Sequence, residues 1–281
     1  MNYAYYAGCS LHATGREFDL SARAVCARLG IGLAEIPDWN CCGASSAHST
    51  SHLLAVSLAA RNLALAEAQG AGDIVVPCAA CYQRLAVARK ELGEDPGLRE
   101  RVARVTARDY AGRTGVRSLL EVLGGLDAEH LKAQVTRPLD GLKAACYYGC
   151  LLVRPPAVTG FDDPEDPRSM DDLVRLAGAE SLPWGYKTEC CGAAHGVANE
   201  PVTLKLVRDI LEVARRAGAD CLVCACPLCQ NNLDARQEHV NRAFGTDFGL
   251  PVLYFTQLLG SAFGLSGREL GLDKHFVKFA F

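Results

Sequence analysis

Cysteine motifs recur along this 281-residue chain in an order that repeats once. The first half carries three motifs, Tyr5-Tyr6-Ala7-Gly8-Cys9, Cys41-Cys42-Gly43 and Cys78-Ala79-Ala80-Cys81. The second half carries their counterparts, Tyr147-Tyr148-Gly149-Cys150, Cys190-Cys191-Gly192 and Cys226-Pro227-Leu228-Cys229. The gaps between motifs are 31 and 35 residues in the first copy and 39 and 34 in the second. This order predicts an internal duplication, and therefore a chain built from two similar units.

The segments around these motifs predict the α/β class. Residues 70–78 align without gaps on residues 218–226, and both read as a helix end, a short buried strand and a cysteine turn. Helices are predicted before them at 53–69 and 202–217, and a strand followed by a helix is predicted after them at 116–123 and 252–259. Because short apolar strands alternating with helices are typical of parallel sheets, we expect two similar cysteine-rich domains, each with a small parallel sheet flanked by helices.

The boundary between the domains is expected near residue 140. The stretch 93–141 is polar and carries Gly and Pro, and residues 136–141 form its best local break. This predicts domains at 1–140 and 141–281, both of ordinary size. A second stretch, 154–170, is rich in Pro and Asp and predicts an exposed loop after Cys150. A plain solvated loop is favoured there over a lid or a docking segment.

Composition gives no support to several classes of function. Lys and Arg are scattered and the formal net charge is −3, so no basic patch for nucleic acid or anionic membranes is expected. No stretch approaches the roughly 18 uninterrupted apolar residues of a membrane span, so direct membrane insertion is not expected. The first ten residues do not resemble a secretory signal, which predicts a cytoplasmic protein. The chain has fourteen cysteines, and thiols stay reduced in the cytoplasm. This combination favours metal ligation or redox chemistry over structural disulfides.

Each repeat offers five cysteines, whereas a structural zinc or an ordinary cubane cluster takes four ligands. Adjacent cysteines, with α-carbons about 3.8 Å apart, fit poorly on one ion but can reach neighbouring irons of one cluster. Gly43 and Gly192 allow a sharp turn or a close approach to such a cluster. Each Cys-x-x-Cys pair stands at a strand-to-helix junction, where N–H groups stabilise thiolates, and Pro227 suits the first helical turn. A polynuclear site is therefore favoured over zinc or a thioredoxin-like dithiol.

Taken together, the motifs resemble the duplicated cysteine-rich CCG domain of the B-type subunit of heterodisulfide reductase, over nearly the whole chain. The resemblance implies two non-cubane 4Fe-4S clusters, each bound by five cysteines, with a disulfide cleaved between them in one-electron steps. The implied ligands of the first cluster are Cys9, Cys41, Cys42, Cys78 and Cys81. The implied ligands of the second are Cys150, Cys190, Cys191, Cys226 and Cys229. The longer gap after Cys150 removes no ligand.

The family also implies partners. These are a ferredoxin-like C-type subunit, a flavin-containing A-type subunit, and a thiol or disulfide substrate or a lipoyl carrier protein. No Gly-x-Gly-x-x-Gly loop is present, so neither flavin nor nicotinamide is expected in this chain. Related CCG domains serve lactate and glycolate oxidation, quinone-linked dehydrogenases and a heterodisulfide-reductase-like complex of sulfur oxidisers. The Ala- and Arg-rich composition favours this last, bacterial setting.

Three hypotheses about function follow. The first is a catalytic iron–sulfur subunit that cleaves or forms a disulfide or persulfide. The second is a non-catalytic electron relay that links a flavin dehydrogenase to a quinone or another acceptor. The third is a chain with one complete cluster and a second site that is empty or holds zinc.

Residues outside the implied ligand set receive weaker predictions. Cys26, Cys146, Cys221 and Cys224 are expected to be structural, with Cys146 as a possible substitute ligand or nearby thiol. A separate zinc site from residues 221, 224, 226 and 229 is disfavoured because it would consume two cluster cysteines. Three histidines near the motifs are candidate proton donors to a leaving thiolate, namely His12, His48 and His195, with His195 preferred. Lys187 is a candidate for holding an anionic substrate group, although lysines are usually solvated.

Overall fold

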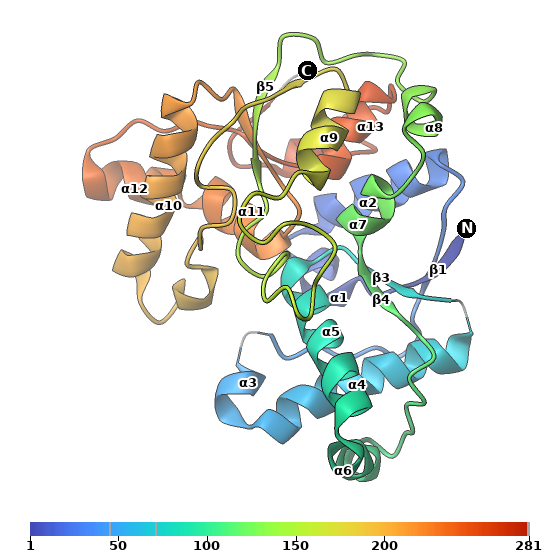
Figure 1. The fold of residues 1–281 in the computed structure, drawn as a ribbon. Helices are drawn as coiled ribbons and strands as arrows, with labels where there is room; N and C mark the ends of the chain where they lie inside the picture. Colours follow the sequence, from blue (N-terminus) through green and yellow to red (C-terminus); the bar gives the residue numbers. More distant parts are fainter. Residues whose placement is uncertain (45, 71, 280–281) are drawn as a thin grey trace.

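Two four-stranded parallel sheets organise the computed structural model, which describes residues 1–44, 46–70 and 72–279 (Figure 1). The first sheet has the strand order β2-β1-β3-β4 and the second β6-β5-β7-β8. The first contains β1 (Asn2–Tyr5), β2 (Gly32–Glu35), β3 (Ile74–Val76) and β4 (Val116–Ser118). The second contains β5 (Lys143–Tyr147), β6 (Glu180–Ser181), β7 (Cys221–Cys224) and β8 (Val252–Tyr254). The predicted fold class and the duplication are therefore confirmed.

Strand pairing also fixes which residues of the two halves correspond. Ala4 of β1 pairs with Ile74, and Ala145 of β5 pairs with Leu222. Because Ile74 and Leu222 both lie four residues before the first cysteine of a Cys-x-x-Cys pair, Ala4 is the counterpart of Ala145. One residue further along, the core position of Tyr5 is taken by Cys146 in the second half. Two residues further along, Tyr6 corresponds to Tyr147.

The helices that position the cysteines begin and end close to the predicted bounds. They are α4 (His52–Gln69), α5 (Ala79–Glu94), α10 (Glu200–Arg216) and α11 (Pro227–Ala235). Ser51 caps α4 by accepting a hydrogen bond from Leu54 N–H, and Asn199 caps α10 by accepting one from Val202 N–H. Cys78 and Cys226 are the residues that precede α5 and α11, and Pro227 occupies the first turn of α11, as expected.

The remaining helices cover the sheets and join the two halves. They are α1 (Gly8–His12), α2 (Arg16–Arg28), α3 (Ala47–Thr50), α6 (Pro96–Thr106), α7 (Leu119–Gly124), α8 (Ala128–Lys132), α9 (Ser169–Leu176), α12 (Gln237–Phe244) and α13 (Phe255–Ala262), with short 3-10 turns η1 (Ala193–His195) and η2 (Leu272–Lys274). None of the helices in the described ranges is long and apolar enough to cross a membrane.

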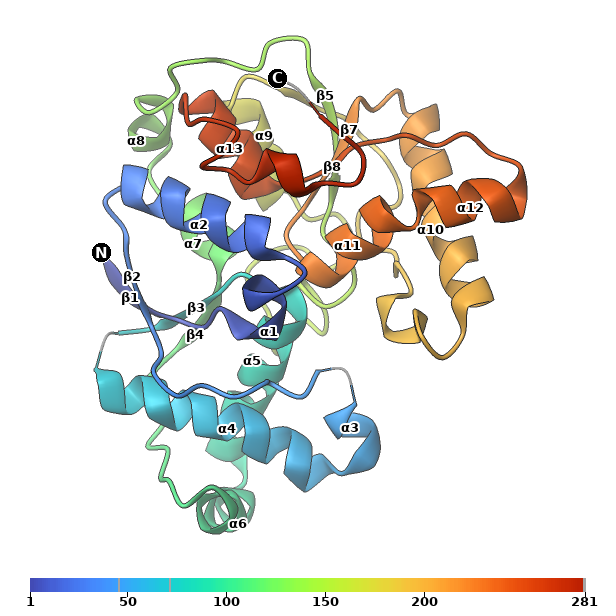
Figure 2. The same ribbon diagram turned by 180° about the vertical axis from the view of Figure 1, so that it is seen from behind.

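The two halves share one core. Helix α13 of the second half lies on α2 of the first half (Figure 2). There the rings of Phe18 and Tyr254 stack with centroids 4.2 Å apart, and Ser21 Oγ lies 2.7 Å from Thr256 Oγ1. Helix α7 lies against α9 in the same way. The division predicted at residue 140 falls between α8 and β5 and stays a prediction.

The segment predicted as an exposed loop, 154–170, is irregular as far as Arg168 and mostly exposed, and it also contacts the first half. The Tyr82 hydroxyl of α5 donates to the carbonyl of Thr159 (3.0 Å), and the Phe161 ring meets the Tyr82 ring edge-on. At the end of the loop, the Asp162 carboxylate accepts hydrogen bonds from the N–H and hydroxyl groups of Ser169. The prediction of an exposed loop therefore holds for most of the segment, and the contacts of Thr159 and Phe161 with Tyr82 of the first half are an addition that the sequence did not show.

Candidate functional site

The cysteine motifs gather because they follow the carboxyl ends of neighbouring parallel strands. Gly8-Cys9 comes just after β1, and Cys78 comes just after β3, its neighbour in the sheet. Gly149-Cys150 and Cys226 follow β5 and β7 in the same manner. The Cys-Cys-Gly motifs lie in the segments after β2 and β6. In open parallel sheets ligands bind beyond this edge of the strands, so the topology alone brings each set together.

In the first set, Cys41, Cys42, Cys78 and Cys81 are linked by contacts between their thiols. Cys42 Sγ lies 3.2 Å from Cys81 Sγ, and Cys78 also interacts with Cys81. The N–H of Gly43 donates to Cys41 Sγ (3.4 Å). Burial raises the pKa of Tyr6, and the nearby thiols of Cys81, Cys42, Cys41 and Cys9 raise it further.

The second set repeats this arrangement. Cys191 Sγ lies 3.6 Å from Cys229 Sγ, and the N–H of Gly192 donates to Cys190 Sγ (3.3 Å). Cys150 interacts with Cys190, and Cys226 interacts with Cys229. Burial and the thiols of Cys229, Cys191, Cys150 and Cys190 raise the pKa of Tyr147, the counterpart of Tyr6. The structure therefore brings together each five-cysteine set that the sequence predicted.

The two sets also meet each other. Cys78 of the first half interacts through its side chain with Cys226 of the second, which raises the pKa of Cys78 and lowers that of Cys226. Helix α1 contacts α11 at the same place. A cavity of about 340 Å³ lies beside this junction. All five cysteines of the second set line this cavity. Ala44, Ala79 and Ala80 of the first half also contribute to its wall.

Hydrogen bonds between the thiols lower the pKa of one partner toward the thiolate, the form that binds metals, and raise the pKa of the other, as in the pairs of Cys42 with Cys41 and of Cys190 with Cys150. Hydrogen bonds from Cys41 and Cys81 lower the pKa of Cys42 to about 3. The hydrogen bond with Cys150 lowers the pKa of Cys190 to about 6, with help from the Gly192 N–H and the charge of His195. Cys9, Cys41 and Cys190 are exposed, Cys150 is half-buried, and the other six thiols are buried.

Four glycines make this packing possible. Gly43 and Gly192 turn the chain with φ of 77° and 76°, and a Cβ at either position would press against α4 or α10 at 3.0 Å or less. Gly8 and Gly149 also have positive φ, and a Cβ there would lie 3.2 Å from the sulfur of Cys81 or Cys229. The sharp turn expected from the sequence is confirmed, and helices pack closely against it.

Tyr6 and Tyr147 are site residues that the sequence analysis did not single out. The Tyr6 hydroxyl donates to the carbonyl of Asn40 (2.7 Å), and the Tyr147 hydroxyl donates to the carbonyl of Glu189 (2.6 Å). Each bond holds the residue immediately before a Cys-Cys pair. The signal was the repeated tyrosine before each Gly-Cys motif, which served only to recognise the duplication.

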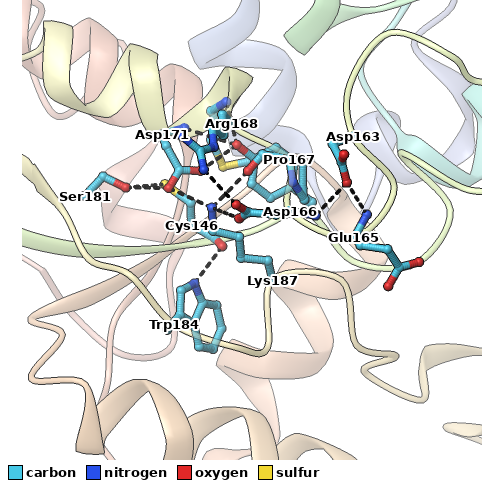
Figure 3. Close-up of polar contacts among 12 residues, drawn as sticks. Cys146, Asp163, Glu165, Asp166, Pro167, Arg168, Asp171, Ser181, Trp184 and Lys187 are labelled. Carbon is cyan, nitrogen blue, oxygen red and sulfur yellow. Dashed lines mark hydrogen bonds and ion pairs between the residues drawn. The ribbon is translucent and has the colours of Figure 1, made fainter.

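A buried ion pair distinguishes the second half (Figure 3). Lys187 Nζ lies 3.1 Å from Asp171 and 3.0 Å from Asp166, and the Lys187 and Asp171 side chains are only 9% and 2% exposed. Tyr148 and Ser181 donate their hydroxyl hydrogens to Asp171 at 2.6 and 2.7 Å. Burial lowers the pKa of Lys187, but its contacts with Asp166 and Asp171 outweigh this and raise it.

This ion pair fixes the backbone that carries the second thiol set. The carbonyl of Lys187 accepts hydrogen bonds from the N–H groups of Tyr148 and Gly149, just before Cys150. Lys187 itself lies three residues before Cys190. Its side chain is therefore neither solvated nor directed at a substrate, and both predictions made for it were wrong. The buried carboxylate of Asp171, which the sequence did not flag, explains why.

The other predicted residues fall into two groups. Cys26, Cys146, Cys221 and Cys224 are buried, as expected, and Cys146 Sγ lies 3.7 Å from Ser181 Oγ within the network of Figure 3. Among the histidines, His12 is hydrogen-bonded to Glu35 (2.9 Å) and packs on Trp39, and His48 is exposed on α3. His195 is exposed in η1 close enough to Cys190 to affect its pKa.

The donor set fits an iron–sulfur cluster better than a single ion. Within the described ranges, no group of three or more His, Cys, Asp or Glu side chains is arranged to hold one metal ion. Seven of the thiols instead form a chain of pairwise contacts through both halves, in the order Cys41, Cys42, Cys81, Cys78, Cys226, Cys229 and Cys191, and Cys150 pairs with Cys190 beside it. Proteins that bind clusters through cysteines use three features found here. These are thiolates, N–H groups that donate to sulfur, and glycines that let sulfur approach the backbone.

Comparison with known proteins places this fold and site in a family. The family model of the CCG cysteine-rich domain matches residues 3–86 and 144–234, which are the two cysteine-bearing regions. The chain belongs to this family, in its duplicated form known from the B-type subunit of heterodisulfide reductase, and the resemblance seen in the sequence is confirmed.

Two relatives are similar over most of their lengths. The chain is 37% identical over 258 residues to the B-type subunit of the ferredoxin/F(420)H(2)-dependent CoB-CoM heterodisulfide reductase of Methanosarcina acetivorans, covering 89% of this chain and 85% of that one. It is 36% identical over 278 residues to the 8-methylmenaquinol:fumarate reductase membrane anchor subunit of Wolinella succinogenes, covering 98% and 96%. Both are subunits, so the kinship supports an iron–sulfur redox subunit that works with partners.

A solved structure shows the same fold. A hypothetical protein from Helicobacter pylori superposes with a TM-score of 0.81 at 17% identity, covering 99% of this chain and 52% of that one. This chain thus spans about half the length of that protein, and the likeness concerns the fold alone.

Proposed function

We propose that this chain is the redox subunit of a heterodisulfide-reductase-like complex, and that it cleaves or forms a disulfide or persulfide at two non-cubane 4Fe-4S clusters. The observation that carries the proposal is the junction of the two thiol sets at Cys78 and Cys226, with a cavity open to the second set. A substrate sulfur in that cavity would stand within reach of both redox sites.

The cysteines would be the cluster ligands. Cys9, Cys41, Cys42, Cys78 and Cys81 would hold the first cluster, and Cys150, Cys190, Cys191, Cys226 and Cys229 the second. Tyr6, Tyr147 and the four glycines keep the two Cys-Cys turns in place. When bound, the clusters supply one-electron transfers.

The reaction requires two electrons and two protons. In the reducing direction a disulfide takes up both, its S–S bond breaks, and two thiols leave; in the oxidising direction the same electrons and protons are released. We propose His195 as the donor of one proton, because it lies exposed beside Cys190. The electrons would come from, or go to, a flavin-containing A-type subunit through a ferredoxin-like C-type subunit.

A second candidate is an electron relay in a quinol-linked reductase. It is favoured by the Wolinella relative, whose name gives a menaquinol and fumarate as the reactants of its complex and no disulfide. In this case the same ligands would carry electrons between a quinol and a flavin partner, and the cavity would bind no sulfur substrate.

Two measurements on anaerobically purified protein test these candidates. Iron and sulfide analysis should give about eight irons per chain, four for each cluster. About four would contradict the two-cluster proposal and leave one site. Thiols or disulfides should then perturb the electron paramagnetic resonance of the clusters. Signals that never respond to sulfur compounds, in a protein that still transfers electrons, would favour the relay.

Single cysteine variants test the ligand assignment. Cys42→Ser and Cys191→Ser should each lower the iron content to about half, because each removes one ligand of one cluster. Cys26→Ala is the control, since Cys26 lies buried in α2 outside both sets, and it should keep the full iron content. Full iron in both serine variants would contradict the assignment.

A further inference from the structure

Another cavity, of about 560 Å³, lies along the C-terminal half of α5. Helix α5 begins directly after Cys78 and leads away from the thiol junction toward α6 (Figure 1). No cysteine is among the described residues that line this cavity, so it is separate from both thiol sets. Ala157 and Val158, from the loop after Cys150, belong to its wall. Its volume is in the range of small-molecule sites, and both halves of the chain contribute to it.

The charged side chains around this cavity are mainly basic. Arg89, Lys90 and Arg99 line it, and the single acidic residue among the described lining residues, Glu94, pairs with Lys90. In the part of the chain that the structure describes, neither arginine forms an ion pair with a carboxylate. Residues 84–117 hold nine Lys and Arg against five Asp and Glu, although the formal net charge of the whole chain is −3. A local excess of positive charge at a cavity attracts anionic ligands.

The second half shows that packing does not require the charge of Arg89. Its counterpart is Gln237, because each stands eleven residues after the first cysteine of a Cys-x-x-Cys pair. Arg89 Nε donates to the carbonyl of Thr114 (3.1 Å), two residues before β4. Gln237 Nε2 donates to the carbonyl of Leu250 (2.7 Å), two residues before β8. A neutral amide therefore makes the same backbone contact, and the arginine adds a charge that this contact does not need.

Arg89 is also held in place at the cavity. The buried Tyr110 donates its hydroxyl hydrogen to the same carbonyl of Thr114 (2.9 Å) and interacts with the Arg89 side chain. A guanidinium presents a planar fork of N–H donors, which matches the oxygen atoms of a phosphate. Because its position is fixed before a ligand arrives, Arg89 loses little conformational freedom on binding.

The rest of the lining favours an organic phosphate over a bare anion. Leu92, Val116 and Val158 form an apolar part of the wall, and such surface stabilises an organic group that it removes from water. A phosphate monoester carries about −1.5 to −2 charge at neutral pH. This charge suits two arginines without carboxylate partners better than the single charge of a carboxylate does.

We propose that this cavity binds a small organic phosphate of about nucleotide size. Arg89 and Arg99 hold the phosphate, and the organic part lies against Leu92, Val116 and Val158. The proposal does not depend on the disulfide function. It adds a ligand site that lies apart from the thiol sets and joins the two halves of the chain.

Three probes test the class of ligand. Titration calorimetry of the anaerobically purified, iron-loaded protein at low ionic strength would compare AMP, inorganic phosphate, which lacks the organic part, and adenosine, which lacks the charge. AMP should bind about three- to tenfold more tightly than phosphate, and adenosine should not bind. No saturable binding of AMP below about 10 mM, AMP no tighter than phosphate, or adenosine as tight as AMP would overturn the proposal and leave the disulfide function intact.

Variants test the site itself. Arg89→Gln introduces the residue that makes the same contact in the second half, so the urea unfolding midpoint should stay close to that of the parent protein. Arg89→Gln and Arg99→Gln should each weaken AMP binding at least about fivefold. Arg104→Gln is the control, since Arg104 is exposed on α6 outside the cavity lining, and it should leave the affinity unchanged. Unchanged affinity in Arg89→Gln, or equal weakening in all three variants, would overturn the site.

Two further measurements locate the ligand and its source. AMP should slow hydrogen exchange in peptides that cover residues 108–116 and 154–160, and protection confined to other segments would overturn the assignment to this cavity. Phosphatidic acid presents the same phosphate monoester at a membrane surface. Sedimentation of the protein with vesicles of phosphatidic acid and phosphatidylcholine that is lost in Arg89→Gln and is not competed by AMP would overturn the proposal of a small soluble ligand.

Discussion

The buried pair of Lys187 and Asp171 allows a stability prediction with a worked magnitude. Lys187→Met keeps an unbranched, apolar side chain but removes the cation that lies 3.1 Å from a carboxylate only 2% exposed. Removing one partner of a buried ion pair costs about 3–5 kcal/mol, because the other charge stays buried and uncompensated. Asp171 keeps the hydroxyl groups of Tyr148 and Ser181, so we expect the low end, about 3 kcal/mol.

The pairing is isolated by a double-mutant cycle with Asp171→Asn. The asparagine keeps the size of the side chain and removes its charge, so the double variant no longer contains an unpaired buried ion. We expect the combined loss to fall short of the sum of the single losses by about 2 kcal/mol. The free energy of unfolding would be measured by urea denaturation of the anaerobically purified protein at pH 7.

The control is Lys205→Met on α10, which breaks an exposed pair with Asp209. It should cost less than about 1 kcal/mol. A loss for Lys187→Met no larger than this control, or strict additivity in the cycle, would refute the reasoning. Because Lys187 O accepts from the backbone before Cys150, we also expect the single variant to lose iron from the second set.

Three further outcomes follow from the described contacts. Gly192→Ala should cost about 1–3 kcal/mol in urea unfolding, because φ is 76° and α10 packs at 3.0 Å, whereas Gly185→Ala, with open space around it, should change stability little. Burial raises the pKa of Cys26 and Cys221 to about 12, so both stay protonated at pH 8, and mass spectrometry after iodoacetamide treatment of the folded protein should find them unmodified; labelling at rates of exposed thiols would contradict their burial. Tyr147→Phe should cost about 0.5–1.5 kcal/mol through loss of the hydrogen bond to the carbonyl of Glu189, and an unchanged unfolding midpoint would refute that role.

Local signals in the sequence were sufficient for the sheet and the thiol sets. The short strands that begin at Ile74 and Cys221 are apolar and bounded by turn residues. Because the chain is duplicated, each of these patterns occurs twice in the sequence. Helices α4 and α10 begin at capping residues and carry periodic apolar positions, so their bounds were predicted to within a few residues.

Contacts between distant segments were beyond such signals. Lys187 was expected to be solvated because nothing nearby in sequence shows that Asp171, sixteen residues earlier, is buried beside it. The loop after Cys150 was expected to be exposed because its composition is polar, and most of it is, but composition gave no sign of its contact with Tyr82 of the other half. Tyr6 and Tyr147 act on carbonyl groups more than thirty residues away. Each case depends on tertiary packing that one sequence does not display.

The packing of α13 on α2, together with that of α7 on α9, has a meaning for the origin of the chain. Under the correspondence of the two halves, α13 is the counterpart of α7 and α2 is the counterpart of α9, so the two contacts are the same contact made twice in reverse. This is the geometry of an isologous dimer, in which each copy covers the same face of the other. The chain is thus arranged like a homodimer joined into one polypeptide, in which each half covers a helix of the other. The two copies also differ from each other. Lys187, which pairs with Asp171 in the second copy, corresponds to Asp38 in the first, so the first copy lacks a lysine at this position.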